Sequence, residues 1–144
     1  MNLYQGGMTT MSIVHDNTIQ SYTVDFETDT LIIKTLHCTD KTQEKTNVIF
    51  TDYLAHTFDG EMKGSIIFDI REYQLEHFLR EELNMMREQR RFGWPMYYKT
   101  ENELIEFFQT NGYKVFEISS SYGLCGWVFA KQMDFIADES ESYI

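Results

Sequence analysis

The sequence has little of what marks a secreted or membrane-spanning protein. Its 144 residues include two cysteines and one proline, and Cys38 and Cys125 are too few and too far apart to predict a disulfide framework. No apolar run approaches the ~20 residues that a membrane helix needs, and no basic segment followed by an apolar stretch opens the chain. We therefore expect a cytoplasmic protein with reduced thiols and no membrane contact.

Basic residues are also scarce. The sequence contains 12 Lys and Arg residues and 23 Asp and Glu residues, which gives a net charge of −11. Such a charge disfavours binding to nucleic acid or anionic membranes, whose phosphates are themselves negative. The basic residues are unevenly placed, because every arginine lies between residues 71 and 91. The acidity therefore belongs to the rest of the chain.

Aromatic residues are plentiful, with 11 Phe, 9 Tyr and 2 Trp. A chain of this length hides roughly 70% of its unfolded surface on folding, so it can build a core without a metal or a disulfide. We expect residues 1–10 to be a tag remnant or disordered leader, residues 11–138 to form a single α+β domain, and residues 139–144 to be an acidic frayed tail.

Alternation of apolar and polar residues predicts strands before residue 70 and after residue 112. The first is marked by Tyr22, Val24 and Phe26 at alternate positions. The segments expected to form strands are 20–27, 30–36, 48–50, 52–58, 65–70, 113–118 and 124–130, and 134–144 is expected to be an acidic tail.

Helical spacing appears between these two groups of strands. Asp69 followed by Glu72 resembles a capping box, which predicts a helix from there to Arg91, before Gly93 and Pro95. Thr100 with Glu103 repeats the signature, and this second helix is expected to end at Asn111-Gly112.

Strands, two helices and strands again indicate an α+β fold. We predict an antiparallel β-sheet of about six strands with two consecutive helices packed on one face, and the strand order stays open. One arrangement places the helices over the sheet face that carries Tyr22, Val24 and Phe26.

Motifs for cofactor or metal chemistry are missing. The sequence has no Gly-rich phosphate loop, nucleophile-elbow serine or dinucleotide fingerprint. His15, His37, Cys38 and His56 do not form a recognised ligand spacing. We therefore expect no cofactor and no metal.

Cys125 is the one candidate nucleophile, because Gly123, Gly126 and Trp127 flank it and would let a substrate approach. Catalysis would require His56 or His77 to lie beside it in space. The alternative function is therefore a small ligand-binding protein or thiol enzyme with a pocket near Cys125 and Trp127.

Binding is the leading hypothesis, since Trp, Tyr and Arg dominate interface hot spots. The segment 92–98 holds Trp94, Tyr97 and Tyr98, which we expect to be anchors, directly after the arginines. The candidate partner-binding residues are these three with Arg87, Arg90, Arg91, Asp25, Glu27 and Asp29, the acids serving as steering charges. The sequence thus indicates a non-enzymatic module, of the inhibitor or immunity type found in bacteria, that masks a basic protein partner. A homodimer is a further possibility.

Overall fold

The computed structural model describes residues 12–139. The expected tag remnant or leader at 1–10 and most of the expected frayed tail at 139–144 lie outside the described residues. Within them the chain forms eight strands and three helices, so the α+β class and antiparallel sheet are confirmed, while the predicted number of about six strands is too low.

The strands come in two groups that flank the helices in sequence. The first five are β1 (Thr18–Asp25), β2 (Thr30–Cys38), β3 (Gln43–Thr51), β4 (Ala55–Asp59) and β5 (Ile66–Tyr73). After the helices α1 (Leu75–Glu81), α2 (Leu83–Arg90) and α3 (Glu101–Asn111) come β6 (Lys114–Tyr122), β7 (Cys125–Ala130) and β8 (Gln132–Ala137).

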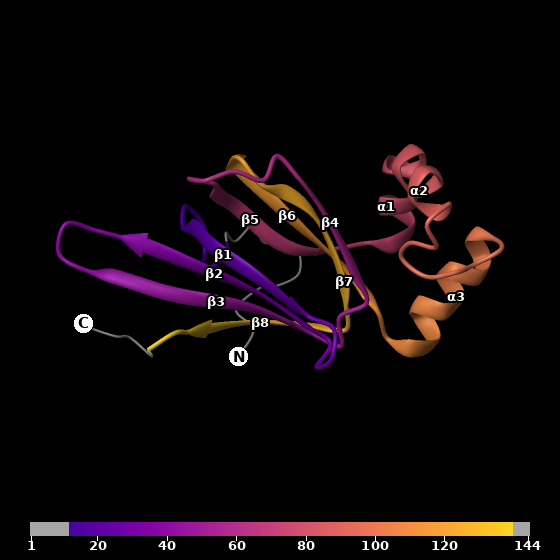
Figure 1. Ribbon diagram of the computed structural model, residues 1–144, viewed down its shortest axis with the longest axis horizontal. Helices are drawn as coiled ribbons and strands as arrows, with labels where there is room; N and C mark the ends of the chain where they lie inside the picture. The colour runs from indigo at the N-terminus through magenta and orange to yellow at the C-terminus, as the bar shows by residue number, and fades with distance from the viewer. Residues whose placement is uncertain (1–11, 140–144) are drawn as a thin grey trace.

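The sheet runs in the order β4-β7-β6-β5-β1-β2-β3-β8 and folds over on itself. Figure 1 shows the half β1-β2-β3-β8 inclined to the half β4-β7-β6-β5. Two strand pairs pass from one half to the other: β3 pairs with β8, and their continuations β4 and β7 pair with each other. At this corner the Lys131 N–H donates to the Thr51 carbonyl at 3.1 Å, and the Leu54 N–H donates to the Phe129 carbonyl at 2.8 Å.

The core between the two halves is built by alternation along the strands. Successive side chains of a strand point to opposite faces, and in β7 Val128 and Ala130 join the core between the halves while Trp127 and Phe129 face the helices. The Phe50 and Phe116 rings, one from each half, lie 5.4 Å apart. This inner face also carries Tyr22 and Val24.

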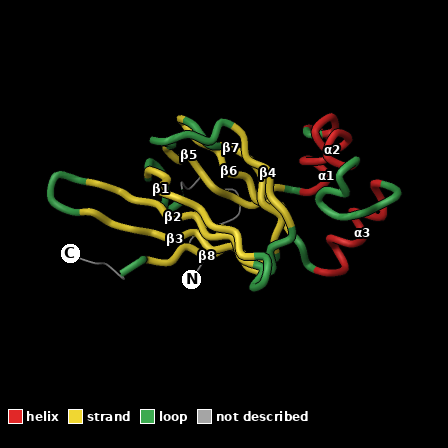
Figure 2. Tube along the Cα trace, viewed as in Figure 1, coloured by secondary structure: helices red, strands yellow, loops and turns green. Residues whose placement is uncertain are grey.

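The helices cover the other face of β4, β7 and β6, at one end of the molecule (Figure 2). Their buried residues Phe78, Leu104 and Phe108 pack with Trp127 and Phe129 of β7. The arrangement that placed them over Tyr22, Val24 and Phe26 is therefore wrong.

The predicted first helix differs most from the structure. Asp69 lies inside β5 rather than at a helix cap, because β5 pairs with β6 as far as Tyr73; its carboxylate accepts a hydrogen bond from the Ser12 N–H at 3.2 Å. The helix begins at Leu75 and is interrupted at Glu82, whose φ of −109° and ψ of 29° leave the helical region, so α1 and α2 are two short helices.

The second helix forms as predicted. The Thr100 hydroxyl accepts a hydrogen bond from the Glu103 N–H at 3.2 Å, and Gly112 ends α3 with a φ of 78°. The prediction of an acidic tail over 134–144 is wrong in part, because residues 134–137 belong to β8 and pair with β3.

Candidate functional site

The structure separates the three expected anchors of segment 92–98. Tyr97 is exposed (77%), whereas Tyr98 is buried and packs among the helices. Trp94 is half-buried, and its ring centroid lies 5.2 Å from that of Phe129. Trp94 and Tyr98 therefore attach this segment to β7 and the helices, and of the three expected anchors only Tyr97 has an exposed ring.

Of the three candidate arginines, Arg90 helps to attach this segment to α2. The Arg90 guanidinium donates to the Tyr98 carbonyl at 3.0 Å and lies 4.8 Å from the centre of the Tyr98 ring. Arg91, the residue after α2, reaches Glu88 at 3.8 Å. Arg87 lines a small hollow beside Leu83 and Tyr98. The positive charge is thus partly compensated within the chain.

The acids Asp25, Glu27 and Asp29 lie at the turn between β1 and β2. The Asp25 carboxylate accepts hydrogen bonds from the N–H groups of Glu27, at 2.9 Å, and Thr28, at 3.3 Å, and these bonds hold its pKa below the usual range. Asp29 adopts a φ of 55°, and its carbonyl accepts from the Tyr53 N–H at 2.9 Å. The turn is therefore fixed against the corner between β3 and β4.

That contact brings the acids beside a cluster of aromatic rings. Phe26 is 77% exposed, and its ring centroid lies 6.2 Å from that of Tyr53. The Tyr53 hydroxyl and His56 Nδ1 are 2.7 Å apart, and Phe58 lies 4.8 Å from the His56 ring, centre to centre. Tyr22 of β1 closes the cluster at 5.0 Å from Phe58.

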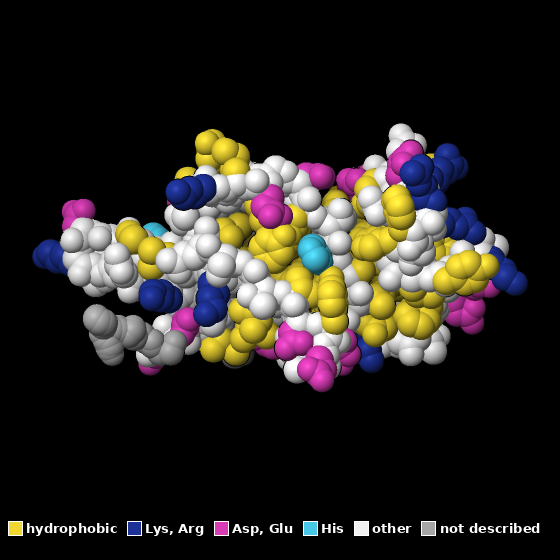
Figure 3. Space-filling model, in the orientation of Figure 1, with side chains coloured by type: hydrophobic (Ala, Val, Ile, Leu, Met, Phe, Trp, Pro, Cys, Tyr) yellow, Lys and Arg dark blue, Asp and Glu magenta, His cyan; other side chains and the backbone are white. Residues whose placement is uncertain are grey.

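We call this the acidic–aromatic surface. Its rings are Tyr22, Phe26, Tyr53, His56 and Phe58, and its acids are Asp25, Glu27, Asp29, Asp52 and Glu61. Figure 3 shows hydrophobic side chains gathered on the face where β1 and β4 lie, with acidic side chains beside them near the β1–β2 turn.

Only the carboxylates of this surface carry charge near neutral pH. Burial raises the pKa of Tyr53 to about 12, and the hydrogen bond to Glu61, at 2.7 Å, followed by burial, raises that of Tyr22 to about 12. Burial lowers the pKa of His56, which favours its neutral ring. The surface is therefore an apolar patch with a negative border.

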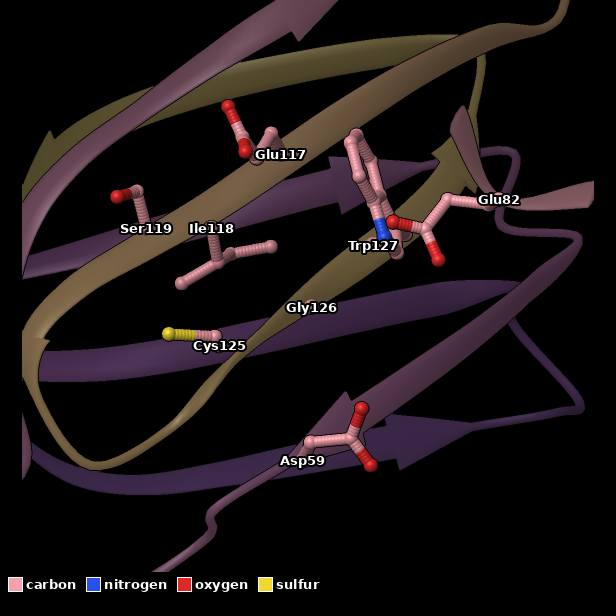
Figure 4. A pocket seen from close by; sticks show the side chains of 8 residues that line it. All are labelled: Asp59, Glu82, Glu117, Ile118, Ser119, Cys125, Gly126 and Trp127. Carbon is pink, nitrogen blue, oxygen red and sulfur yellow. The ribbon is translucent and has the colours of Figure 1, made fainter. Parts of the chain in front are cut away.

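A hollow lies on the helix-bearing side of the sheet. It is a hollow of about 240 Å³ lined by Asp59, Glu82, Glu117, Ile118, Ser119, Cys125, Gly126 and Trp127 (Figure 4). The hollow does lie beside Cys125 and Trp127, where the alternative function placed a pocket. The Cys125 thiol is 4.0 Å from the Ser120 carbonyl.

Neither candidate histidine lines this hollow. His56 points into the aromatic cluster on the opposite face of β4, and His77 pairs with Glu81 at 3.1 Å. None of the described residues that line the hollow is a general base of the histidine type or a cation that would stabilise a thiolate. The lining of the hollow therefore gives Cys125 neither the histidine nor the cation that would activate its thiol.

Sequence reasoning did not place Tyr53, His56, Phe58 and Glu61 in a binding surface, and it considered His56 only as a metal ligand or as the catalytic partner of Cys125. Asp25 and Glu27 on either side of Phe26 were a visible signal, but the ring that lies against Phe26 is that of Tyr53, between β3 and β4, which is distant in sequence.

Two kinds of site are missing from the described part of the chain. Residues 12–139 contain no group of three or more His, Cys, Asp or Glu that could hold a metal ion. No helix formed by these residues is both long and apolar enough to cross a membrane.

Comparison of the sequence and the structure with family models, curated proteins and solved structures finds no match. The geometry of the two surfaces is therefore the basis for a functional proposal.

Proposed function

We propose that this protein is a non-enzymatic binding module, cytoplasmic and of the inhibitor or immunity type, that masks a basic protein partner. The observation that carries the proposal is the acidic–aromatic surface: an exposed Phe26 against Tyr53, in the turn that holds the acids Asp25, Glu27 and Asp29.

The chemistry of this surface favours a basic partner. Exposed aromatic rings supply the large contact areas that dominate binding energy at interface hot spots. The surrounding carboxylates provide the complementary potential that speeds encounter with a positive surface and rejects a negative one. Because Tyr22, Tyr53 and His56 favour their neutral forms near pH 7, nothing in this cluster of rings offsets the acids.

The anchor is therefore assigned to Phe26 rather than to Trp94 or Tyr98, whose rings are committed to packing. The expected steering acids Asp25 and Glu27 keep their proposed role, now beside Phe26.

The test is affinity capture from native cell lysate with three forms of the protein. We expect wild type and Phe92→Ala to retain one stoichiometric basic protein, and Phe26→Ala to lose it. Phe26 and Phe92 are both exposed, at 77% and 71%, so the two variants remove the same side chain from nearly the same exposure. A hot-spot role predicts that Phe26→Ala weakens the complex by at least ~2 kcal/mol.

The charge component is measured separately with the captured protein. Glu27→Gln should slow association and reduce its salt dependence, whereas Glu106→Gln on α3, outside this surface, should leave both nearly unchanged. Capture that survives Phe26→Ala, or an acidic partner, would contradict the proposal.

A further inference from the structure

One edge of β1 is free over most of its length. β1 pairs with β2 along the whole strand, but toward β5 its pairing within residues 12–139 is limited to Thr18 with Ile66. The Ile19 N–H donates to the Ser65 carbonyl at 2.9 Å, and beyond this bond the two strands diverge (Figure 1). No backbone hydrogen bond from the described part of the chain reaches this edge over residues 21–25.

The backbone groups on the free edge follow from the alternation of an antiparallel ladder. Successive residues turn their N–H and C=O groups to one neighbouring strand and then to the other. Ile19 turns its N–H to β5, and a one-residue bulge separates it from Ser21. Beyond the bulge, Tyr22 and Val24 therefore turn their backbone groups to the free edge, and Thr23 between them turns to β2.

The side chains beside this edge are incompletely covered. Tyr22 and Val24 pack against the core between the two halves of the sheet, yet both stay half-buried. Opposite them, β4 presents the half-buried Phe58, whose ring centroid lies 5.0 Å from that of Tyr22. A further strand along the edge would cover these apolar groups with every second side chain, because alternate residues of a strand point to the same face.

The charges along the edge select the strand that can bind there. Free edges are commonly blocked by lysine or proline, and residues 21–25 contain neither. The charged residue among them is Asp25, and Glu27 follows in the turn. Glu61 also lies here, since it accepts a hydrogen bond from the Tyr22 hydroxyl at 2.7 Å. An acidic strand would bring like charges to these acids, whereas a basic strand would compensate them.

We propose that the free edge of β1 binds an extended, basic segment of a partner protein, which joins the sheet through backbone hydrogen bonds to Tyr22 and Val24. In this mode of recognition the backbone bonds supply affinity and alternate side chains supply specificity. Apolar side chains of the segment cover Tyr22 and Phe58, and its basic side chains lie near Asp25. The inference rests on the proposed function, because it names the part of the basic partner that the acidic–aromatic surface receives.

The probe is a seven-residue peptide of alternating lysine and valine, acetylated at its N-terminus and amidated at its C-terminus. Hydrogen exchange of the backbone amides, followed by NMR, is the readout. We expect the peptide to slow exchange at Tyr22 and Val24 about ten-fold or more and to leave the amides of β8, at one end of the sheet, unchanged. The same peptide with glutamate in place of lysine should bind about ten-fold more weakly or worse.

Two N-methylated peptides test whether backbone bonds carry the binding. One is methylated on its valines and the other on its lysines. Because alternate residues of a strand donate to the same side, one form loses the donors that face β1 and the other loses only donors that face away. We expect one form to bind about ten-fold more weakly or worse than the parent peptide and the other to bind equally.

A pair of variants tests the same bonds from the side of the protein. Val24→Pro removes an N–H from the free edge, where proline is tolerated, and should weaken peptide binding about ten-fold or more. Val24→Ala keeps the N–H and loses a similar side chain, so it should weaken binding less. The melting temperature of each variant shows whether it is folded.

Three results with the peptides would overturn the inference: unchanged exchange at Tyr22 and Val24, equal binding of the two methylated forms, or equal binding of the acidic peptide. Protection of these two amides in a dimer of the free protein would also overturn it, since a second copy would then occupy the edge.

The captured partner separates this inference from the proposed function. If the partner binds but leaves the amides of Tyr22 and Val24 exchanging as in the free protein, strand addition is wrong and the proposed function stands. If lysate capture retains no basic protein while the basic peptide protects both amides, the proposed function is contradicted and strand addition at β1 is supported.

Discussion

Replacement of Phe129 by alanine is the sharpest test of how the helices are attached to the sheet. The Phe129 side chain is 1% exposed and faces the helix-bearing side of β7. Its ring centroid lies 5.3 Å from that of Phe78 in α1, 5.2 Å from that of Trp94, and 5.3 Å from that of Phe108 in α3. One ring therefore joins both helical segments and the segment between them to the strand.

The magnitude follows from these contacts. A buried Phe→Ala change costs about 3–5 kcal/mol, and each favourable aromatic pair adds about 0.5–1.5 kcal/mol beyond area burial. Because the three pairs share one ring, their contributions are not additive, and we expect Phe129→Ala to lower the free energy of unfolding by about 4 kcal/mol. This is a large share of the 5–15 kcal/mol that typically stabilises a domain. With a urea m-value of about 2 kcal/mol/M, the midpoint should fall by roughly 2 M.

Urea unfolding followed by circular dichroism measures this loss, with Phe26→Ala as the matched control. The same substitution at a 77% exposed ring should change stability by no more than about 0.5 kcal/mol. Similar losses in the two variants would refute the reasoning, since burial would then not decide the cost. A loss below about 1 kcal/mol for Phe129→Ala would show that the helices are held elsewhere.

Three further predictions concern a cap and two titrating groups. Thr100→Ala should cost about 1 kcal/mol in thermal or urea unfolding because it removes the acceptor of the Glu103 N–H, and Thr100→Ser should restore most of that loss. The pKa of His56 is lower in the folded chain than its ordinary 6.5, so the unfolded chain binds the proton first; stability should fall as the pH drops below that value, and less so in His56→Phe. The pKa of Glu82 is raised on folding, so its ionisation opposes folding; Glu82→Gln should stabilise the protein near pH 7, by about 0.5 kcal/mol given solvent screening, and the gain should vanish below the ordinary glutamate pKa of 4.5 when unfolding is compared across pH.

Local signals in the sequence were sufficient for the elements that depend on local contacts. Thr100, Glu103 and Gly112 define α3 because a helix cap is made by residues three or four positions apart. The same pattern at Asp69 and Glu72 misled, since pairing of β5 with β6 gave those residues hydrogen-bond partners outside any helix. Tertiary pairing overrode the local preference.

For a similar reason, the sequence predicted only part of the acidic–aromatic surface. Asp25, Glu27 and Phe26 are neighbours in sequence, and their exposure follows from a two-strand turn. That Tyr53 lies against Phe26 depends on where the chain turns from β3 into β4, which is fixed by the pairing of β7 and β8 with those strands. No pattern within a short window encodes that pairing.

The corner shared by the two halves also bears on how the chain reaches this structure. The halves are joined where Thr51 pairs with Gln132 and Ala55 pairs with Phe129, and these pairings connect segments that are far apart in sequence. Contacts of such long sequence separation slow folding, because the loop-closure entropy is lost before the contact is made. During synthesis one edge of β3 therefore stays unpaired until β8 has emerged from the ribosome. In that interval β3 is paired on one side only, with β2, and its free edge exposes the nascent chain to aggregation.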